Sequence, residues 1–162
     1  MGHYDVALVC QNGHVATGLA SRSSLHNKFC DKCGAPTITT CPSCQTNIRG
    51  EYYSEDVFIL GDSGYVVPSF CYQCGRAFPW TQRRLDAARA LADEVFGLNP
   101  EEREQLKRSL DDLVSDTPNT PVAVHRFKRL MVKAGKATAD TFYKVLVDVM
   151  SEAAKKAIWP AA

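Results

Sequence analysis

The 162-residue sequence contains no long hydrophobic run. Its first twenty residues hold no apolar run longer than Val6–Val9, and no segment approaches the ~20 apolar residues of a transmembrane helix. We therefore expect no signal peptide, no membrane contact and a cytoplasmic location. The cytoplasm is reducing, which keeps cysteine thiols available for metal binding instead of disulfide formation.

The sequence also lacks a marked excess of charge. Its net charge is +1 at pH 7, which does not by itself favour nucleic acid or an acidic membrane as a partner. Only the segment 121–136 carries charge of a single sign, because it contains basic residues and no acidic residue. Its basic residues are Arg126, Lys128, Arg129, Lys133 and Lys136. They predict a local basic face, which either contacts nucleic-acid phosphates or is simply solvated.

Cysteine is absent after residue 74 and frequent before it. One cysteine opens the segment Cys10-Gln-Asn-Gly-His14, and the other six form three Cys-x-x-Cys pairs. These pairs are Cys30/Cys33, Cys41/Cys44 and Cys71/Cys74. Seven thiols and one imidazole make two sets of four tetrahedral ligands, whereas disulfides would leave one thiol unpaired. We therefore predict two structural Zn²⁺ ions.

The order of the half-sites predicts which residues share an ion. The pattern Phe-Cys-x-x-Cys-Gly occurs at Phe29 and again at Phe70, as the closing, treble-clef-like knuckle of two successive units. The first predicted site comprises Cys10, His14, Cys30 and Cys33, and the second comprises Cys41, Cys44, Cys71 and Cys74. The alternative is a RING-type cross-brace, in which the first and third half-sites share an ion, but the seven residues between Cys33 and Cys41 are long for its centre.

His14 is the predicted fourth ligand of the first ion. Asn12 and Gly13 form a tight turn that brings its imidazole back toward Cys10. His26 and His3 are alternatives that lack such a turn. His125 belongs to a predicted helix and is expected at the surface.

The sequence predicts an α+β fold, because its composition changes near Trp80. Two small β zinc ribbons are expected over 1–40 and 41–80, followed by a bundle of about four helices over 81–162 that is docked on the ribbons. Short strands are expected within 4–9, 52–60 and 64–68. The connecting segment Ala77–Trp80 is apolar, so we expect Phe78 and Trp80 to be buried between the two halves.

Capping residues predict the helix boundaries. Thr81 is expected to cap a helix that Gly97 ends, with Phe96 in its buried stripe, and Asn99-Pro100 is expected to start a helix that ends near residue 115. A third helix is expected from 121 to 134, and a fourth over 139–158. The fourth has a wide apolar face, which fits either a central bundle helix or the seam of a homodimer. The oligomeric state is left open.

Sequence signatures of zinc-dependent catalysis are missing. The chain has neither a His-x-Glu pair nor a His-Glu-x-x-His helix, and it contains no Gly-rich phosphate loop. If His14 is a ligand, both zinc sites are closed by four protein ligands, which leaves no position for a reactive water. We expect no enzymatic activity, and zinc-dependent hydrolysis is a remote alternative.

Several motifs resemble those of a known family. They are Tyr4-Asp-Val-Ala7, Cys10-x-Asn-Gly-His14, Phe29-Cys-x-x-Cys-Gly34, Cys41-Pro-x-Cys44, Ile48-x-Gly50, Cys71-x-x-Cys-Gly75 and Pro79-Trp-Thr81. This combination is similar to a family of uncharacterised bacterial double-zinc-ribbon proteins, and the likeness extends to Asp116-Thr-Pro118 and Ser151-Glu152-x-x-Lys155-Lys156. The resemblance implies the metal ligands and a bacterial cytoplasmic origin. It implies no activity.

Two main hypotheses for function follow. In the first, the protein is an adaptor whose zinc ribbons present a surface to an unknown protein partner. The insert 45–70 supplies the aromatic residues for it, Tyr52, Tyr53, Phe58 and Tyr65, unless these rings instead cover the junction with the helices. In the second, the protein is a nucleic-acid-binding regulator that uses the basic helix 121–136.

Overall fold

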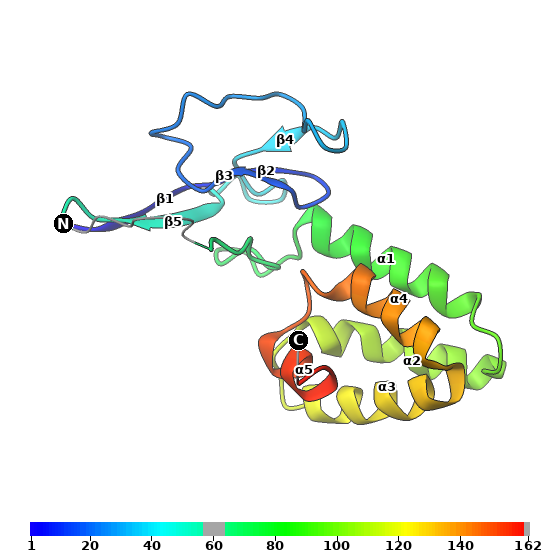
Figure 1. Cartoon of the computed structure of the whole chain (residues 1–162). Coiled ribbons are helices and arrows are strands. Elements are labelled where there is room, and N and C mark those ends of the chain that lie inside the picture. Colours follow the sequence, from blue (N-terminus) through cyan, green and yellow to red (C-terminus); the bar gives the residue numbers. More distant parts are fainter. Residues whose placement is uncertain (57–63, 161–162) are drawn as a thin grey trace. The chain divides into compact units, whose positions relative to one another are not determined.

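The computed structural model describes residues 1–56 and 64–160. The chain forms two compact units, Met1–Gln82 and Arg83–Ala162. The strands of the described residues belong to the first unit, and helices make up the second (Figure 1). The predicted α+β class is therefore confirmed.

Two small antiparallel sheets form the first unit. In one, β1 (His3–Val6) pairs with β5 (Arg49–Tyr53). In the other, β2 (Leu8–Cys10) lies between β3 (Val15–Thr17) and β4 (Thr37–Ile38). Since only Ala7 separates β1 from β2, one N-terminal segment contributes to both sheets. Ala7 and all of β2 are buried, so this segment forms the core of the unit.

The strand predicted over 64–68 is wrong. Its backbone is irregular and is anchored by side chains instead of a strand ladder. The Tyr65 hydroxyl donates a hydrogen bond to the carbonyl of Arg49, and the carbonyl of Pro68 accepts one from Trp80. The strand predicted over 52–60 ends at Tyr53, and its residues 57–60 lie outside the described residues.

A buried aromatic pair ends the first unit. The rings of Phe78 and Trp80 stack with centroids 4.6 Å apart, and both side chains are buried. The Thr81 hydroxyl donates a 2.8 Å hydrogen bond to the carbonyl of Ser69, which anchors the start of α1 (Pro79–Asp93). The burial of Phe78 and Trp80 is thus as expected, while the docking of the helices on the ribbons stays a prediction.

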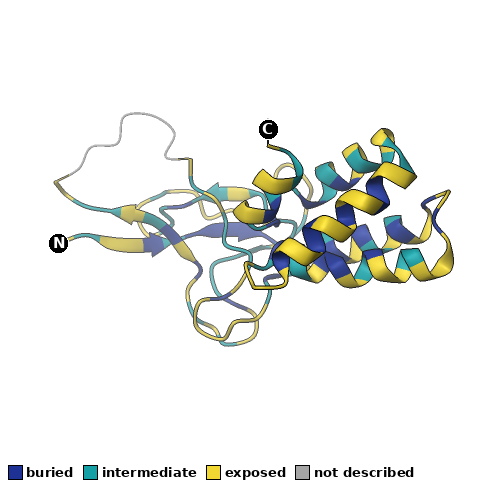
Figure 2. Cartoon of the chain, turned by 90° about the horizontal axis from the view of Figure 1, so that it is seen from below, coloured by how far each residue is buried: buried dark blue, intermediate teal, exposed yellow. Residues whose placement is uncertain are grey.

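Among the helices of the described residues, α1, α2 and α3 follow their predicted bounds with small shifts. α2 (Pro100–Val114) begins with a capping box between Asn99 and Glu102, and α3 (Thr120–Ala134) ends at Gly135, whose φ is +96°. α1 begins at Pro79, so Thr81 lies within the helix and does not cap it as predicted, and the helix ends earlier than predicted, at Asp93. Phe96 consequently lies outside the helix and is exposed, contrary to the prediction that it is buried. Figure 2 shows the buried faces of the helices and their exposed outer faces.

The fourth predicted helix is two helices in the structure. α4 (Lys136–Leu146) and α5 (Glu152–Ile158) are separated by a turn in which Val149 and Met150 are buried. Ser151 caps α5, because its hydroxyl accepts a hydrogen bond from the backbone N–H of Ala154. The signal for this break was the pair Ser151-Glu152, an N-cap residue followed by an acid in the first turn.

No helix in the described ranges is both long and apolar enough to cross a membrane.

Candidate metal centres

The three Cys-x-x-Cys segments have the same backbone geometry. In each, the residue before the first cysteine forms an antiparallel bridge with the third residue after the second cysteine. These bridges are Phe29–Pro36, Thr40–Asn47 and Phe70–Ala77. In each, the residue after the second cysteine also donates its N–H to the carbonyl of the first at 2.8 or 2.9 Å. The sequence repeat, recognised in two segments, therefore includes the third.

The shared turn requires a left-handed backbone conformation after the second cysteine. Gly34 and Gly75 supply it, with φ of +70° and +71°. Gln45 adopts the same conformation with φ of +61°, and it is the non-glycine residue with positive φ in the described part of the chain. Left-handed backbone is unfavourable for residues with a Cβ. The turn at Cys41–Cys44 therefore adopts its geometry despite the backbone preference of Gln45 for negative φ.

The first candidate metal group contains Cys10, His14, Cys30 and Cys33. The Nδ1 atom of His14 lies 3.6 Å from the sulfurs of both Cys10 and Cys30, and the Cys10 and Cys33 sulfurs are 3.7 Å apart. β2 presents Cys10, and a turn through Gly13, whose φ is +90°, returns the chain to His14.

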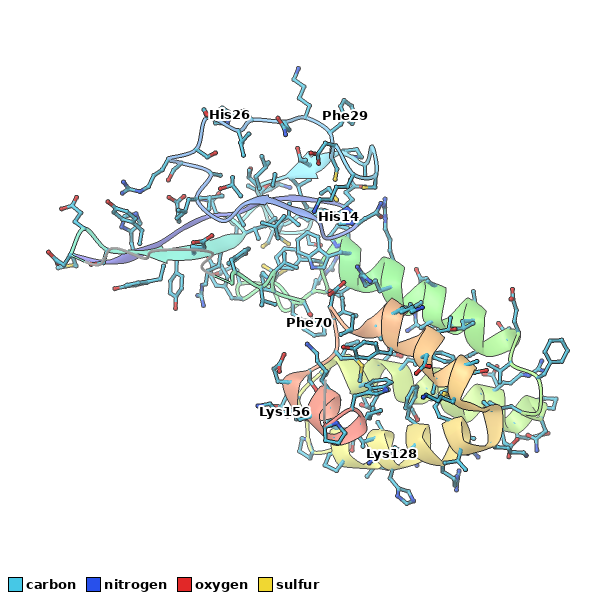
Figure 3. All side chains as sticks on the ribbon, in the orientation of Figure 1. His14, His26, Phe29, Phe70, Lys128 and Lys156 are labelled. Atoms are coloured by element: carbon cyan, nitrogen blue, oxygen red, sulfur yellow. The ribbon has the colours of Figure 1, made fainter. Side chains whose placement is uncertain are left out.

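The other histidines do not belong to this group. His26 is exposed on the segment between β3 and β4, well separated from His14 (Figure 3). His3 is in β1 beside Tyr53, and His125 is an exposed residue of α3. The structure therefore brings together the four residues chosen from the sequence, with His14 and not His26 as the fourth.

The second candidate metal group contains Cys41, Cys44, Cys71 and Cys74. The sulfurs of Cys41 and Cys74 are 3.8 Å apart, and those of Cys44 and Cys71 are 3.6 Å apart. Each group thus combines two half-sites that are successive along the chain. This is the sequential pairing, and the cross-brace pairing does not occur.

The separations within both groups fit a tetrahedral zinc ion. With Zn–S bonds of about 2.3 Å and Zn–N bonds of about 2.0–2.1 Å, the edges of a tetrahedron are about 3.8 Å between sulfurs and about 3.6 Å between sulfur and nitrogen. The sulfur–sulfur distances of 3.6–3.8 Å match the first value, and the distances from His14 match the second. They are far longer than a disulfide bond of about 2.05 Å. Each group could therefore hold a metal ion with four protein ligands.

The thiols of the two groups differ in acidity. The backbone N–H of Ala35 and the side chain of Asn12 lower the pKa of Cys33 to about 6. The side chain and backbone of Thr46 likewise lower the pKa of Cys44 to about 6. Burial raises the pKa of Cys10. Cys33 and Cys44 are therefore readily deprotonated near neutral pH, while Cys10 releases its proton when a metal binds.

Asn12 is a neighbour of the first metal group, and the sequence analysis gave it no role other than forming the turn. Its side-chain Nδ2 lies 3.4 Å from the sulfur of Cys33, as a hydrogen-bond donor to that ligand. Such contacts orient metal ligands and stabilise thiolates. In the sequence, the position of Asn12 inside the motif Cys10-x-Asn12-Gly13-His14 could have indicated this role.

The tyrosines that were predicted to contact a partner lie at two separate places around β5. Tyr52 and Tyr65 line a groove of about 410 Å³, together with Tyr4, Arg49, Val66 and Pro68. Tyr53 packs instead beside His3 and beneath the guanidinium of Arg22, which lies 3.4 Å from the centre of its ring. Phe58 lies outside the described residues.

Arg49 connects this groove to the second metal group. Its guanidinium lies 4.8 Å from the ring centre of Tyr4 and 4.4 Å from that of Tyr72. Tyr72 stands between Cys71 and Cys74, so the metal group fixes its position. We call Tyr4, Arg49, Tyr52 and Tyr72 the tyrosine surface. The sequence analysis did not assign three of these four residues, Tyr4, Arg49 and Tyr72, to a contact surface, although each lies within a motif quoted there.

The basic residues of the segment 121–136, which spans α3 and the first residue of α4, also divide into sets. Lys133 Nζ lies 2.8 Å from both carboxylate oxygens of Glu102, and Arg129 donates a 3.1 Å hydrogen bond to Gln105. Both contacts are with α2. Arg126, Lys128 and Lys136 are exposed and have no hydrogen-bond or ion-pair partner among the described residues. The structure therefore does not gather the five charges on one face.

The fold and the two ligand groups define an α+β protein with two four-ligand Cys/His sites that could each hold a metal ion. The chain belongs to the family of uncharacterized proteins conserved in bacteria (DUF2321), whose model matches residues 3–158. This result confirms the predicted resemblance. Neither the curated proteins nor the solved structures gave a match to the chain.

Proposed function

We propose that this protein is a non-catalytic, zinc-stabilised adaptor of the bacterial cytoplasm, which binds a protein partner through the tyrosine surface. Four protein ligands fill a tetrahedral zinc, as in structural sites, whereas catalytic sites retain a position for water. The two ligand groups therefore support a structural role for the metal. The short strands of the first unit bury little apolar surface, so zinc supplies stability that a larger core would otherwise provide.

The tyrosine surface is the observation that carries the proposal. Tyr4, Tyr52 and Tyr72 are 56%, 55% and 57% exposed, although tyrosine rings are usually well covered. Tyrosine and arginine are the residue types most enriched at the energetic centres of protein interfaces. The contacts of Arg49 with two rings hold the surface in a preformed arrangement, which reduces the entropy lost on binding.

Zinc and partner binding are linked in this proposal through Tyr72. Loss of the second metal ion would release the Cys71–Cys74 turn and displace Tyr72 from Arg49. The partner should therefore bind the zinc-loaded protein and not the protein treated with a chelator. The basic residues of α3 give less support to nucleic-acid binding, because Arg129 and Lys133 are engaged with α2.

The test is photo-crosslinking in bacterial cells with a photoreactive phenylalanine analogue at position 52. Position 53 is the matched control, because Tyr53 belongs to the same strand but packs beside His3 and Arg22. We expect a discrete protein adduct from position 52 only, lost on adding Arg49→Ala. A ribonuclease-sensitive adduct would identify a nucleic acid instead. Equal adducts from both positions, or none, would contradict the proposal.

A further inference from the structure

The helical unit has an open apolar groove that the proposed function does not use. It has a volume of about 360 Å³ and is formed by α3, the start of α4 and the end of α5. Its apolar lining includes Phe127, Met131, Ile158 and Trp159. The Trp159 ring makes tilted contacts with Phe127 and Tyr143, at centroid distances of 5.8 and 4.8 Å. The floor of the groove is thus a packed aromatic cluster with Trp159 partly exposed.

The charged residues lining the groove are Lys128 and Lys136. Lys128 lies in the middle of α3, whereas Lys136 is the first residue of α4, after Gly135 has ended α3. Figure 3 marks Lys128 on α3. Neither lysine has an ion-pair partner within the described residues, in contrast to Lys133, which pairs with Glu102.

Val132 lies one turn after Lys128 on the same side of α3. It lines the groove and is 87% exposed. A single exposed valine is ordinary on a protein surface. Here, however, it extends the apolar lining of a groove that also contains two lysines. The groove therefore combines an apolar lining with two positive charges, one from α3 and one from α4.

We propose that this groove binds an amphipathic acidic helix of a partner protein. Apolar side chains of the partner would pack on Phe127, Met131 and Trp159. Acidic side chains on the flank of its apolar face would pair with Lys128 and Lys136. This site is separate from the tyrosine surface, so the inference goes beyond the proposed function and does not depend on it.

The charge arrangement favours this occupant over others. An aliphatic carboxylate carries one negative charge and could pair with only one lysine. A nucleic acid would use the lysines but would leave the apolar floor without a partner. An acidic amphipathic helix satisfies both features at once, since its charged flank and apolar face are parallel.

The probe is a labelled synthetic helical peptide with leucines on one face and two glutamates on the flank of that face. The analogue with lysine at both glutamate positions is the control peptide. Fluorescence anisotropy with the full-length, zinc-loaded protein should show saturable binding of the glutamate peptide and at least about tenfold weaker binding of the lysine peptide. The double variant Lys128→Glu/Lys136→Glu should weaken binding of the glutamate peptide by about tenfold or more.

Arg126→Glu/Lys144→Glu is the matched control, because it makes the same change in net charge at exposed residues outside the groove lining. It should leave the affinity within about twofold. Thermal melts check that each variant folds, and Lys128→Ala/Lys136→Ala replaces the reversal if that variant does not. Absence of saturable binding, equal binding of both peptides or an equal loss in the control would overturn the proposal.

Other occupants give different results. Saturable binding of dodecanoate that displaces the peptide and does not need both lysines would assign the groove to an aliphatic carboxylate. Dimerisation detected by sedimentation and abolished by Lys128→Glu/Lys136→Glu would assign it to a second copy of the chain. Either result would overturn the peptide proposal. Neither would affect the adaptor proposal, which Tyr52 crosslinking tests independently.

Discussion

The indole N–H of Trp80 donates a 2.9 Å hydrogen bond to the backbone carbonyl of Pro68. Pro68 precedes the Cys71–Cys74 turn of the second metal group. Trp80 also approaches Gly13 of the first group so closely that a Cβ there would lie 3.0 Å from the Cβ of Trp80. One buried side chain thus contacts the segments that lead into both metal groups.

We therefore predict that Trp80→Ala weakens metal retention at both groups. Truncating a buried aromatic of this size costs about 3–5 kcal/mol of unfolding free energy. Trp80→Phe should cost less, about 1–3 kcal/mol, mainly because the Pro68 carbonyl loses its donor. Denaturant unfolding and zinc transfer to a coloured chelator measure both effects. Trp159→Phe, in the helical unit, is the control and should leave zinc transfer unchanged.

A second prediction concerns metal content and pairing. Elemental analysis should give two zinc ions per chain, and Cys10→Ser should reduce this to one. Alkylation and mass spectrometry should then find Cys30 and Cys33 reactive and the second group protected. In the reciprocal variant, Cys71→Ser, the first group should stay protected. Reactivity of Cys41 and Cys44 in Cys10→Ser would instead indicate a cross-brace.

The left-handed turns predict stability changes of opposite sign for substitutions at two equivalent positions, Gly75 and Gln45. A Cβ at Gly75 would meet nothing within 4 Å, so Gly75→Ala tests backbone conformation alone and should destabilise the zinc-loaded protein by about 1 kcal/mol. Gln45→Gly should stabilise it by up to about 1 kcal/mol, because the residue already has positive φ. Thermal unfolding at fixed zinc concentration measures both. Effects of the same sign would contradict this account.

Asn12→Ala should weaken zinc binding at the first group only. The variant removes the hydrogen bond to the Cys33 sulfur, and loss of such a contact typically costs about 10–100-fold in metal affinity. Competition with a chelator of known affinity should resolve one weakened and one unchanged zinc ion. Asn47→Ala, an exposed asparagine of the second group's first turn, serves as the comparison. Unchanged affinity at both sites would show that the Asn12 contact has no effect on the metal.

Ser151→Ala distinguishes a capped break from a continuous helix by the sign of its effect. As the N-cap of α5, Ser151 should cost about 1 kcal/mol of unfolding free energy when replaced. In the interior of one long helix the same change would stabilise the protein, because alanine is the better helix former. Denaturant unfolding followed by circular dichroism gives the sign.

Much of the candidate metal site could be predicted because its chemistry is local. Two cysteines separated by two residues can meet one ion only through a tight turn, and eight ligands divide naturally into two sets of four. The capping box at Asn99 and the stop at Gly135 were also readable, since each depends on a few adjacent residues. The break before Ser151 was missed because the apolar pattern continues across it, which outweighed the capping signal of Ser151-Glu152.

The sequence by itself thus predicted the fold class and the seven cysteine ligands, which follow from residue type and short-range spacing. Only the tertiary structure decided that His14 and not His26 joins the first group, that Tyr53 faces away from Tyr52, and that Lys133 pairs with Glu102 while Lys128 borders a groove. These outcomes depend on which distant segments pack together. Residue type and spacing along the chain determine which chemistry a side chain can take part in, whereas tertiary packing determines which residues it contacts.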